Sequence, residues 1–229
     1  GERLEEVAGA LWTLESLDAG RIIDDDIPDM LRIIISVDPS GCAGEEDKRS
    51  DEIGIIVLAL GVDGRAYVLE DLSGRYSPED WGRLVVSTFD RWEADCIVAE
   101  TNFGGAMVKE VVRAACAAVE RIMVPFKMVK AARGKVVRAE PISALYGGID
   151  SITKLPTIGK VSHVGTFPLL EDQLCGFTMS GYAGEKTPDR ADALVWGVHE
   201  LFPALTRKKK RGEVAPAGEE TGGQHGWMG

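Results

Sequence analysis

Arg32-Ile33-Ile34-Ile35-Ser36-Val37-Asp38-Pro39-Ser40-Gly41 is the stretch that decides the fold of this chain. A run of branched apolar residues of strand length, ended by an acid and then by Pro and Gly, predicts a strand that is buried on both faces. Asp38 stands at the carboxyl end of that strand. Because Asp before Pro and Gly is also ordinary turn chemistry, this stretch taken alone fits a simple turn equally well.

Two further stretches place acids in similar positions. Residues 95–100 form another short apolar strand, which ends on Glu100, while Asp189 and Asp192 lie in the opening of a helix at 187–196. Mg²⁺ and Mn²⁺ are held by hard oxygen ligands. Three acidic positions that are far apart in the sequence, two of them at strand ends, therefore predict a divalent-cation site.

The acids differ in how well a purely structural role explains them. An acid in the first turn of a helix, such as Asp189, is favoured by the helix dipole and the free N–H groups. Asp192 lies a full turn further on the apolar side of the helix, where a carboxylate is costly unless it is paired or ligates a cation. Glu100 could cap the next helix, although the residues after it are better caps. We take Asp38, Glu100 and Asp192 as the candidate catalytic residues.

The composition is that of an ordinary globular protein, with 229 residues, 45% of them apolar and 28% charged. No apolar run reaches membrane-spanning length, and the N-terminus does not resemble a signal peptide, so we expect no membrane contact. The four cysteines form no Cys-x-x-Cys pair and are expected to be reduced thiols in a cytosolic protein. The three scattered histidines argue against a structural zinc site.

The net charge of −11 argues at first sight against a nucleic-acid partner. Residues 121–138, however, carry six basic side chains and no acid, and a basic band beside a carboxylate cluster suits a metal-dependent enzyme that acts on a polyanion. A solvated surface explains the band as well when it is taken alone. The six residues are Arg121, Lys127, Lys130, Arg133, Lys135 and Arg138.

The order of elements predicts an α/β fold with a mixed five-stranded sheet flanked by helices. An Asp-Gly turn at 63–64 between two apolar runs predicts a hairpin, so strands at 32–38, 53–60 and 66–71 should form an antiparallel meander. A helix at 78–92, a strand ending at Glu100, a helix at 104–120 and a strand at 122–125 then alternate, which favours parallel pairing.

The remaining segments complete this expectation. A helix is predicted at 135–146, followed by a loop or hairpin at 147–166, and a last helix, capped by Thr187 with Pro188 at its first position, at 188–205. We expect residues 1–30 to be a lead-in from a preceding domain rather than core, residues 31–205 to be the main domain, and residues 206–229 to be a basic and then Gly-rich disordered tail.

Six short stretches carry a resemblance to a known family: 35–39, 51–55, 99–105, 138–142, 167–173 and 188–194. In this order they resemble the C-terminal nuclease domain of the large terminase subunit of tailed bacteriophages, which has a ribonuclease H-like fold. The resemblance covers roughly residues 10–205, and it implies an endonuclease that cuts concatemeric viral DNA as packaging starts and ends. Residues 147–160 depart from the family in being longer.

The resemblance implies roles for the acids. Asp38, Glu100 and Asp192 match the family's catalytic acids, and Asp189 falls where the family often has another polar residue near a metal. We therefore expect two Mg²⁺ or Mn²⁺ ions about 4 Å apart, bridged by Asp38, with Glu100 completing one site and Asp192, aided by Asp189, the other. Because clustered acids repel one another, metal should bind weakly until DNA phosphate completes the coordination.

Basic residues are expected to hold the DNA backbone without reading its sequence. The candidates are Lys127, Lys130, Arg133, Lys135, Arg138, Lys154 and Lys160. The other partners that the resemblance implies are a packaging ATPase domain N-terminal to this one, the small terminase subunit and the portal, in the cytoplasm of the infected bacterial host. The chain has no Gly-x-x-x-x-Gly-Lys-[Ser/Thr] sequence, so it cannot itself be the packaging motor.

Three alternatives stay open at this point. An actin-like phosphotransferase also begins with a strand that ends in an acid, but it needs further Gly-rich phosphate loops. A Holliday-junction resolvase of the same superfamily would prefer branched DNA over linear DNA. A non-catalytic module that docks on DNA or protein would cleave nothing.

Overall fold

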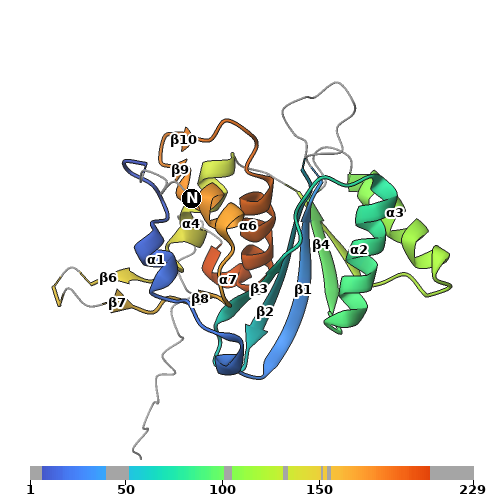
Figure 1. Cartoon of the computed structure of the whole chain (residues 1–229), viewed down its shortest axis with the longest axis horizontal. Helices are drawn as coiled ribbons and strands as arrows, with labels where there is room; N and C mark the ends of the chain where they lie inside the picture. The colour runs from blue at the N-terminus through green and yellow to red at the C-terminus, as the bar shows by residue number, and fades with distance from the viewer. Residues whose placement is uncertain are drawn as a thin grey trace, which may run out of the picture.

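The computed structural model describes residues 7–39, 52–100, 105–130, 134–150, 152–153 and 156–206. A six-stranded mixed sheet stands at the centre of this part of the chain (Figure 1), with the strand order β5-β4-β1-β2-β3-β8. The strands are β1 Met30–Asp38, β2 Gly54–Gly61, β3 Ala66–Asp71, β4 Cys96–Glu100, β5 Phe126–Val129 and β8 Val161–His163.

The predicted antiparallel meander is confirmed. β1 pairs with β2 and β2 with β3 in antiparallel register, and β4 and β5 continue the sheet in parallel beyond β1. Gly64 closes the hairpin between β2 and β3 with φ +74°, a conformation that favours glycine, and the Asp63 carboxylate accepts the backbone N–H of Arg65 at 3.1 Å. The Asp-Gly turn therefore stands where the sequence predicts it.

The mixed α/β class is confirmed, but two details of the sheet differ from the prediction. The sheet has six strands instead of five, because β8 pairs in parallel with the outer edge of β3. The fifth strand begins at Phe126 and not near residue 122. Pro125 has no N–H to donate, so only its carbonyl joins the sheet, accepting from Ile97 at 2.9 Å just before the strand begins.

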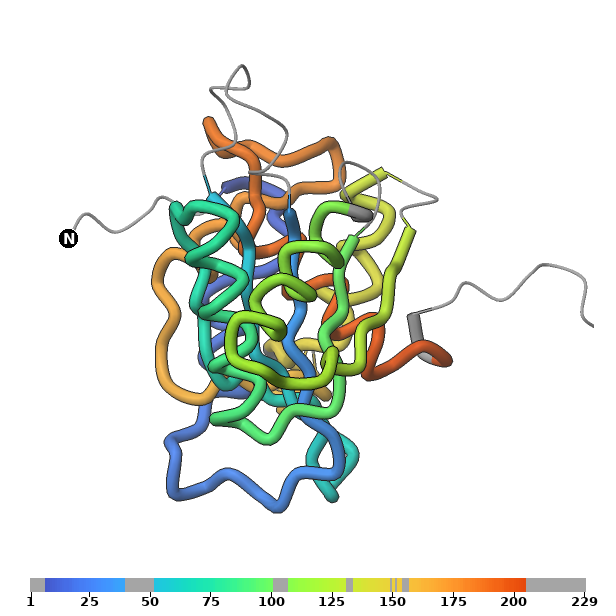
Figure 2. The backbone as a smooth tube through the Cα atoms, turned by 90° about the vertical axis from the view of Figure 1, so that its right-hand side faces the viewer, coloured from blue at the N-terminus to red at the C-terminus, as the bar shows by residue number. Residues whose placement is uncertain are grey.

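Helices cover both faces of the sheet. α2 Pro78–Arg91 and α3 Gly105–Ala118 lie side by side on one face, which is turned toward the viewer in Figure 2. The predicted cap of α2 is confirmed, since the Ser77 hydroxyl accepts the Asp80 N–H. The opposite face carries α1 Leu14–Asp18, α4 Lys135–Ser143, α5 Pro168–Cys175 and α6 Asp189–Leu201, which is followed by α7 Pro203–Thr206. No described helix is long and apolar enough to cross a membrane.

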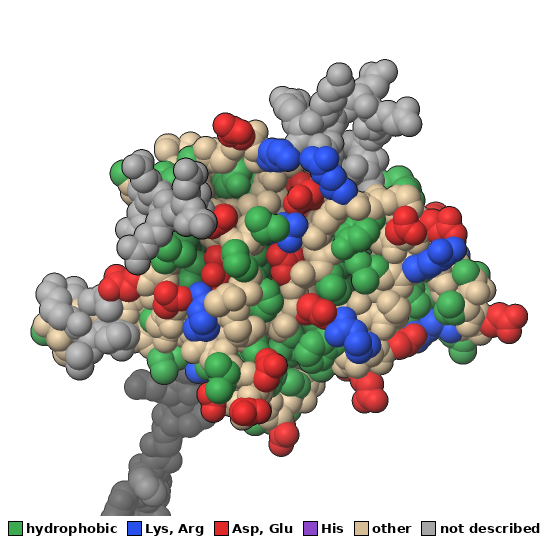
Figure 3. Space-filling view, viewed as in Figure 1, with side chains coloured by type: hydrophobic (Ala, Val, Ile, Leu, Met, Phe, Trp, Pro, Cys, Tyr) green, Lys and Arg blue, Asp and Glu red, His purple; other side chains and the backbone are tan. Residues whose placement is uncertain are grey.

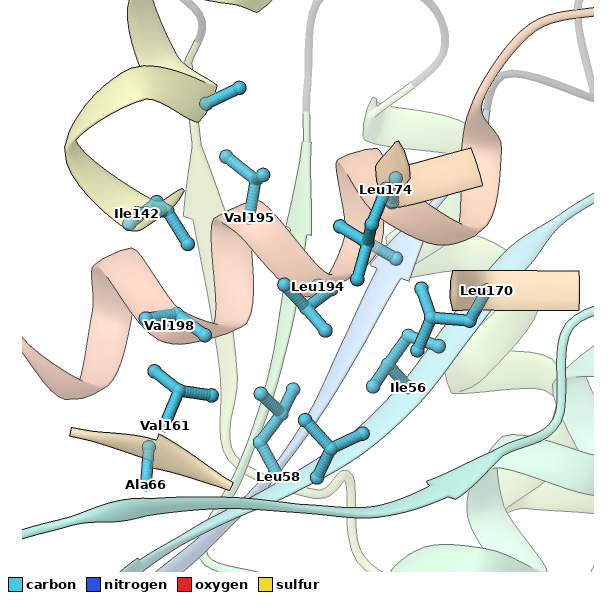
Figure 4. Close-up of a cluster of buried hydrophobic side chains, with 14 of the residues drawn as sticks. Ile56, Leu58, Ala66, Ile142, Val161, Leu170, Leu174, Leu194, Val195 and Val198 are labelled. Atoms are coloured by element: carbon cyan, nitrogen blue, oxygen red, sulfur yellow. The ribbon is translucent and has the colours of Figure 1, made fainter. Parts of the chain in front are cut away.

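α6 lies across the middle of its face of the sheet and makes the larger part of the packing there. Leu194, Val195 and Val198 of α6 point toward Ile56 and Leu58 of the sheet and toward neighbouring helices (Figure 4), and all five are buried. A Cβ on Gly197 of this helix would lie 2.4 Å from the Leu58 side chain. Glycine there lets the helix approach the sheet closely, which fixes the height of its N-terminal acids.

The part of the predicted lead-in that the structure describes packs into the domain. Trp12 and Leu17 are 0% and 1% exposed, and Trp12 makes edge-on contacts with Tyr146 and Phe177. The expectation that this segment stands outside the core is therefore wrong from about residue 11 onward. The apolar residues of this short segment did not indicate that it packs against distant parts of the chain. The tail at 207–229 lies outside the described residues.

The elements after residue 134 depart from the prediction at several points. α4 ends at Ser143 and not at 146. The predicted loop or hairpin at 147–166 does contain a two-stranded antiparallel pair, β6 Gly148–Ile149 with β7 Pro156–Thr157. α5 was not predicted, and a second small pair, β9 Phe177–Thr178 with β10 Gly181–Tyr182, follows it. α6 stops at Leu201, because Pro203 two residues later cannot continue its hydrogen bonds.

Candidate active site

The ends of β1 and β4 bring two of the candidate acids to one edge of the sheet. Val37 of β1 is in register with Ala99 of β4, so the next residues of these parallel strands are Asp38 and Glu100. Side chains alternate along a strand, and both acids fall on the face that packs against α6. Two carboxylates from distant parts of the sequence thus stand next to each other at the carboxyl edge.

α6 adds its acids from above. Gly54 of β2 is opposite Asp38 in the register, and a Cβ on Gly54 would lie 2.0 Å from the Asp189 carbonyl oxygen. Only glycine allows the first turn of α6 to lie directly on the strand at the level of Asp38. The side chains of Asp38, Asp189 and Asp192 are buried, with relative exposures of 2%, 2% and 1%.

Buried carboxylates need compensating positive charge, and α4 provides it. The Lys135 ammonium lies 2.5 Å from Oδ2 of Asp192. Burial alone would lower the pKa of Lys135, but the charges of Asp192, Asp38 and Asp189 outweigh it and raise that pKa. A single ammonium therefore lies in the field of three of the four candidate acids.

Arg138 and Trp196 hold the fourth acid. The Arg138 guanidinium lies 3.4 Å from Oδ1 of Asp192 and 3.8 Å from Oε2 of Glu100. It also stacks over the Trp196 ring, 4.8 Å from the centroid, while the indole N–H of Trp196 donates to Oε2 of Glu100 at 2.7 Å. These contacts fix the orientation of Glu100 and link it to Asp192.

The arrangement has the chemistry of a divalent-cation site, although the carboxylates are not clustered as metal ligands. Among the described residues no group of three or more His, Cys, Asp or Glu side chains is close enough to hold an ion. Lys135 and Arg138 contact the two Asp192 oxygens instead. Because the acids supply hard oxygen donors and gather round a cationic ammonium, their chemistry fits Mg²⁺ or Mn²⁺.

Those predicted DNA-contacting residues that the structure describes do not form one band. Lys135 and Arg138 contact the acids, as described above. Lys127 pairs with Glu200 at 2.7 Å, and Glu200 also contacts Arg32 at the start of β1. Eight residues of helix separate Glu200 from Asp192, which is about 12 Å. Lys127 therefore stands near the end of α6 that is remote from the acids.

The other basic candidates are spread over the molecule. Lys130 is exposed just after β5, whose last residue is in register with Glu100, so it stands near the carboxyl edge. Lys160 is exposed just before β8, which is the outer strand on the other side of the sheet from β5. On the face shown in Figure 3, Lys and Arg side chains occur in small groups among acidic ones. Arg133 and Lys154 lie outside the described residues.

Two residues beside the site had no role in the sequence analysis. Arg190 is buried and pairs with Asp71 at 2.7 Å and with Glu52 at 3.2 Å, which ties the start of α6 to β3. Gln173 of α5 accepts the backbone N–H groups of Arg190 and Ala191 at 2.9 and 3.1 Å. Neither contact could be found from sequence spacing, because each joins segments that are far apart in the chain.

The start of α6 differs from the prediction, in which Thr187 was the cap and Pro188 the first helical residue. Pro188 is the N-cap of α6 and offers no side-chain acceptor, while the Thr187 hydroxyl donates to Oδ2 of Asp189 at 2.9 Å. A cavity of about 200 Å³ opens beside Asp189, between α5 and the segment before α6. Its lining includes Glu52, Asp172, Gln173, Lys186, Asp189 and Arg190.

Comparisons with known proteins give one family. A sequence model described as the terminase RNaseH-like domain matches residues 35–201. A comparison with curated proteins gives no match.

Among solved structures, the large-terminase nuclease domain of bacterial virus Sf6 with calcium is 14% identical, with a TM-score of 0.56, over 81% of this chain and 97% of that one. The manganese form is 13% identical over the same shares, with a TM-score of 0.55. The T. thermophilus Holliday-junction resolvase RuvC with its junction substrate is 14% identical over 76% of this chain and 96% of that one, with a TM-score of 0.40. At these identities the Sf6 matches show a shared fold.

Proposed function

The chain belongs to the terminase RNaseH-like domain family, and from this we propose that it is the nuclease domain of a viral large terminase subunit. In this proposal it is a metal-dependent endonuclease that cuts concatemeric DNA during genome packaging. Its substrate is double-stranded DNA and its ions are Mg²⁺ or Mn²⁺. In the full protein it follows a packaging ATPase domain and works with the small terminase subunit and the portal in the cytoplasm of the infected host. Residues 31–205 form the nuclease domain together with the segment from about residue 11 that packs against them. The residues before that segment would connect to the ATPase domain, and residues 206–229 would be a tail.

One observation carries the proposal. Asp38 and Glu100 end neighbouring parallel strands, and the first turns of α6 bring Asp189 and Asp192 to the same place. Burial of acids costs free energy unless they are paired or bind a cation, so four acids at one edge of the sheet favour a site for positive charge there. The raised pKa of Lys135 supports the idea that the cluster attracts positive charge.

The residues divide the chemistry among them. Asp38, Glu100 and Asp192, with Asp189 beside them, would hold the cations through their carboxylate oxygens. Cations bound there would supply an activated water and stabilise the leaving oxygen of the phosphodiester. Trp196 keeps Glu100 in its orientation through the indole hydrogen bond. Lys135, once released from Asp192, is long and exposed enough to hold a backbone phosphate, with Lys130 on the same edge.

The test is nicking of supercoiled plasmid in Mn²⁺, Mg²⁺ or EDTA by the natural chain and by Asp38→Asn, Glu100→Gln and Asp192→Asn. We expect cleavage that needs metal and falls at least about 100-fold in each variant, because removal of groups that only support metal ligands already costs about 10–100-fold. Linear and four-way-junction substrates are compared in the same assay. Strong preference for the junction would favour the resolvase alternative.

Glu200→Gln is the matched control. Glu200 is a buried carboxylate on the same helix, and hydrogen bonds from Lys127 and Arg32 lower its pKa although burial alone would raise it. It lies at the other end of α6, so cleavage by this variant should stay near the natural rate. Cleavage that survives Asp38→Asn and Asp192→Asn would reject the proposed site, and no cleavage by the natural chain would favour a docking module.

A further inference from the structure

The start of α6 is capped by a residue from another helix. The first N–H groups of a helix have no partner within it, and a local Ser, Thr, Asp or Asn usually accepts those of the second and third residues. Here the N-cap is Pro188, which has no side-chain acceptor. Oε1 of Gln173, on α5, takes this place and accepts the N–H groups of Arg190 and Ala191 at 2.9 and 3.1 Å. Gln173 thus performs from a distance what a local cap performs in most helices.

The two N–H groups that Gln173 accepts stand between the acids of the site. Asp189 precedes them and Asp192 follows them, and all four residues form the buried first turn of α6. The carbonyl of Asp189 already touches β2 at Gly54, so the turn has little room to move toward the sheet. Gln173 holds the same turn from the side of α5. Together the two contacts determine where both carboxylates lie.

α5 is itself firmly anchored, so the cap is held on a fixed support. Glu171 of α5 accepts hydrogen bonds from Arg21 at 2.7 and 3.2 Å, and lies 2.9 Å from Nδ1 of His163 in β8. Tyr146 contacts the other ring nitrogen of His163 at 3.1 Å. The His163 ring thus bridges the tyrosine and the carboxylate, and its burial lowers its pKa.

We propose that Gln173 is a positioning residue for the reaction: it caps α6 from α5 and thereby fixes Asp189 and Asp192 for cation binding. The side-chain amide oxygen suits this task, because its two lone pairs can accept both N–H groups. Supports of this kind typically change metal affinity or activity by about 10–100-fold when they are removed. The proposal rests on the nuclease function argued above.

The test compares two substitutions of similar size. Gln173→Met removes the acceptor and keeps the length of the side chain, whereas Gln173→Glu keeps an acceptor oxygen. Mn²⁺ binding is titrated by electron paramagnetic resonance, and hydrogen exchange of the Arg190 and Ala191 amides is followed by NMR in EDTA. We expect Gln173→Met to expose these two amides to exchange and to weaken Mn²⁺ binding about 10-fold. Gln173→Glu should retain protection and bind Mn²⁺ within a few-fold of the natural chain.

Val86→Ala controls for general loss of stability. Val86 is a buried residue of α2, on the opposite face of the sheet, and its truncation should lower the melting temperature without changing Mn²⁺ affinity. A Gln173→Met protein that binds Mn²⁺ like the natural chain, or a Gln173→Glu protein that loses as much affinity as Gln173→Met, would overturn the proposal. A natural chain that binds no Mn²⁺ even when DNA is present would instead overturn the nuclease function and the positioning role together, while retained amide protection would show that the cap itself exists.

Discussion

Replacement of Lys135 by Met is expected to destabilise the protein and, at the same time, to tighten its binding of divalent cations. Methionine keeps most of the length and the apolar stem of the side chain but removes the ammonium that lies 2.5 Å from Asp192. The buried acids then lose a positive charge that offsets their repulsion. A cation from solution no longer has to displace that charge.

The magnitude follows from the burial of the two partners. Loss of one partner of a fully buried ion pair costs about 3–5 kcal/mol, whereas exposed pairs contribute about 0–1 kcal/mol. The Asp192 side chain is only 2% exposed, but Lys135 is 42% exposed, and Asp192 keeps its contact with Arg138. We therefore expect a loss of about 1–2 kcal/mol in the free energy of unfolding. The same free energy corresponds to metal affinity about 5–30-fold higher.

Urea unfolding in EDTA measures the first quantity, and a Mn²⁺ titration without DNA measures the second. Lys127→Met is a matched control. Lys127 is 54% exposed and pairs at 2.7 Å with Glu200, which is on α6 as Asp192 is, but this pair lies at the end of α6 remote from the acids. It should leave Mn²⁺ affinity unchanged. At saturating Mn²⁺, cleavage by Lys135→Met should be slower than cleavage by the natural chain, because a phosphate contact is lost.

The refuting result is specific. Equal Mn²⁺ affinity in Lys135→Met and the natural chain would mean that the ammonium does not compete with cations for the acids. Tighter Mn²⁺ binding in Lys127→Met as well would mean that the gain reflects the overall charge of the protein and no particular site.

Two further predictions concern the supports of the site. Gly54→Ala should destabilise the protein by about 1–3 kcal/mol and reduce cleavage, because the new Cβ would lie 2.0 Å from the Asp189 carbonyl oxygen. Gly148→Ala is the control and should have neither effect, because its new Cβ would have no atom within 4 Å. Equal effects of the two substitutions in urea unfolding and plasmid nicking would contradict this reasoning. Burial alone would raise the pKa of Glu171, but hydrogen bonds from His163 and Arg21 lower it from the ordinary 4.5 to about 2. Because this pKa is lower in the folded state than in the unfolded chain, the Glu171 carboxylate stabilises the folded state above pH 4.5, and this stabilisation is lost as the pH falls toward 2. Over that interval the free energy of unfolding of the natural chain, measured with urea, should fall by up to about 3 kcal/mol more than that of Glu171→Gln. Parallel pH profiles of the two proteins would refute the assignment.

Much of the fold follows from local patterns in the sequence. The branched run before Asp38, the Asp-Gly turn at 63–64 and the capped start of α2 at Ser77 each have a short-range physical cause, and each is confirmed. α5 was missed because its eight residues carry only a weak periodic pattern. β8 has three residues, and its short alternating pattern did not place it in the sheet; it pairs there with the open edge of β3.

The sequence alone determined the kinds of residue at the site and the ends of the elements that carry them. Asp38 and Glu100 could be singled out because an acid after a buried apolar strand costs free energy unless it serves a purpose. The tertiary structure decided how the acids are surrounded. Lys135 and Arg138 contact the Asp192 carboxylate, Lys127 lies at the far end of α6, and Gln173 caps the start of that helix. The physical reason is that hydrogen bonds and ion pairs form between groups that the fold brings together, and spacing along the chain carries no record of a contact between segments that meet only after folding.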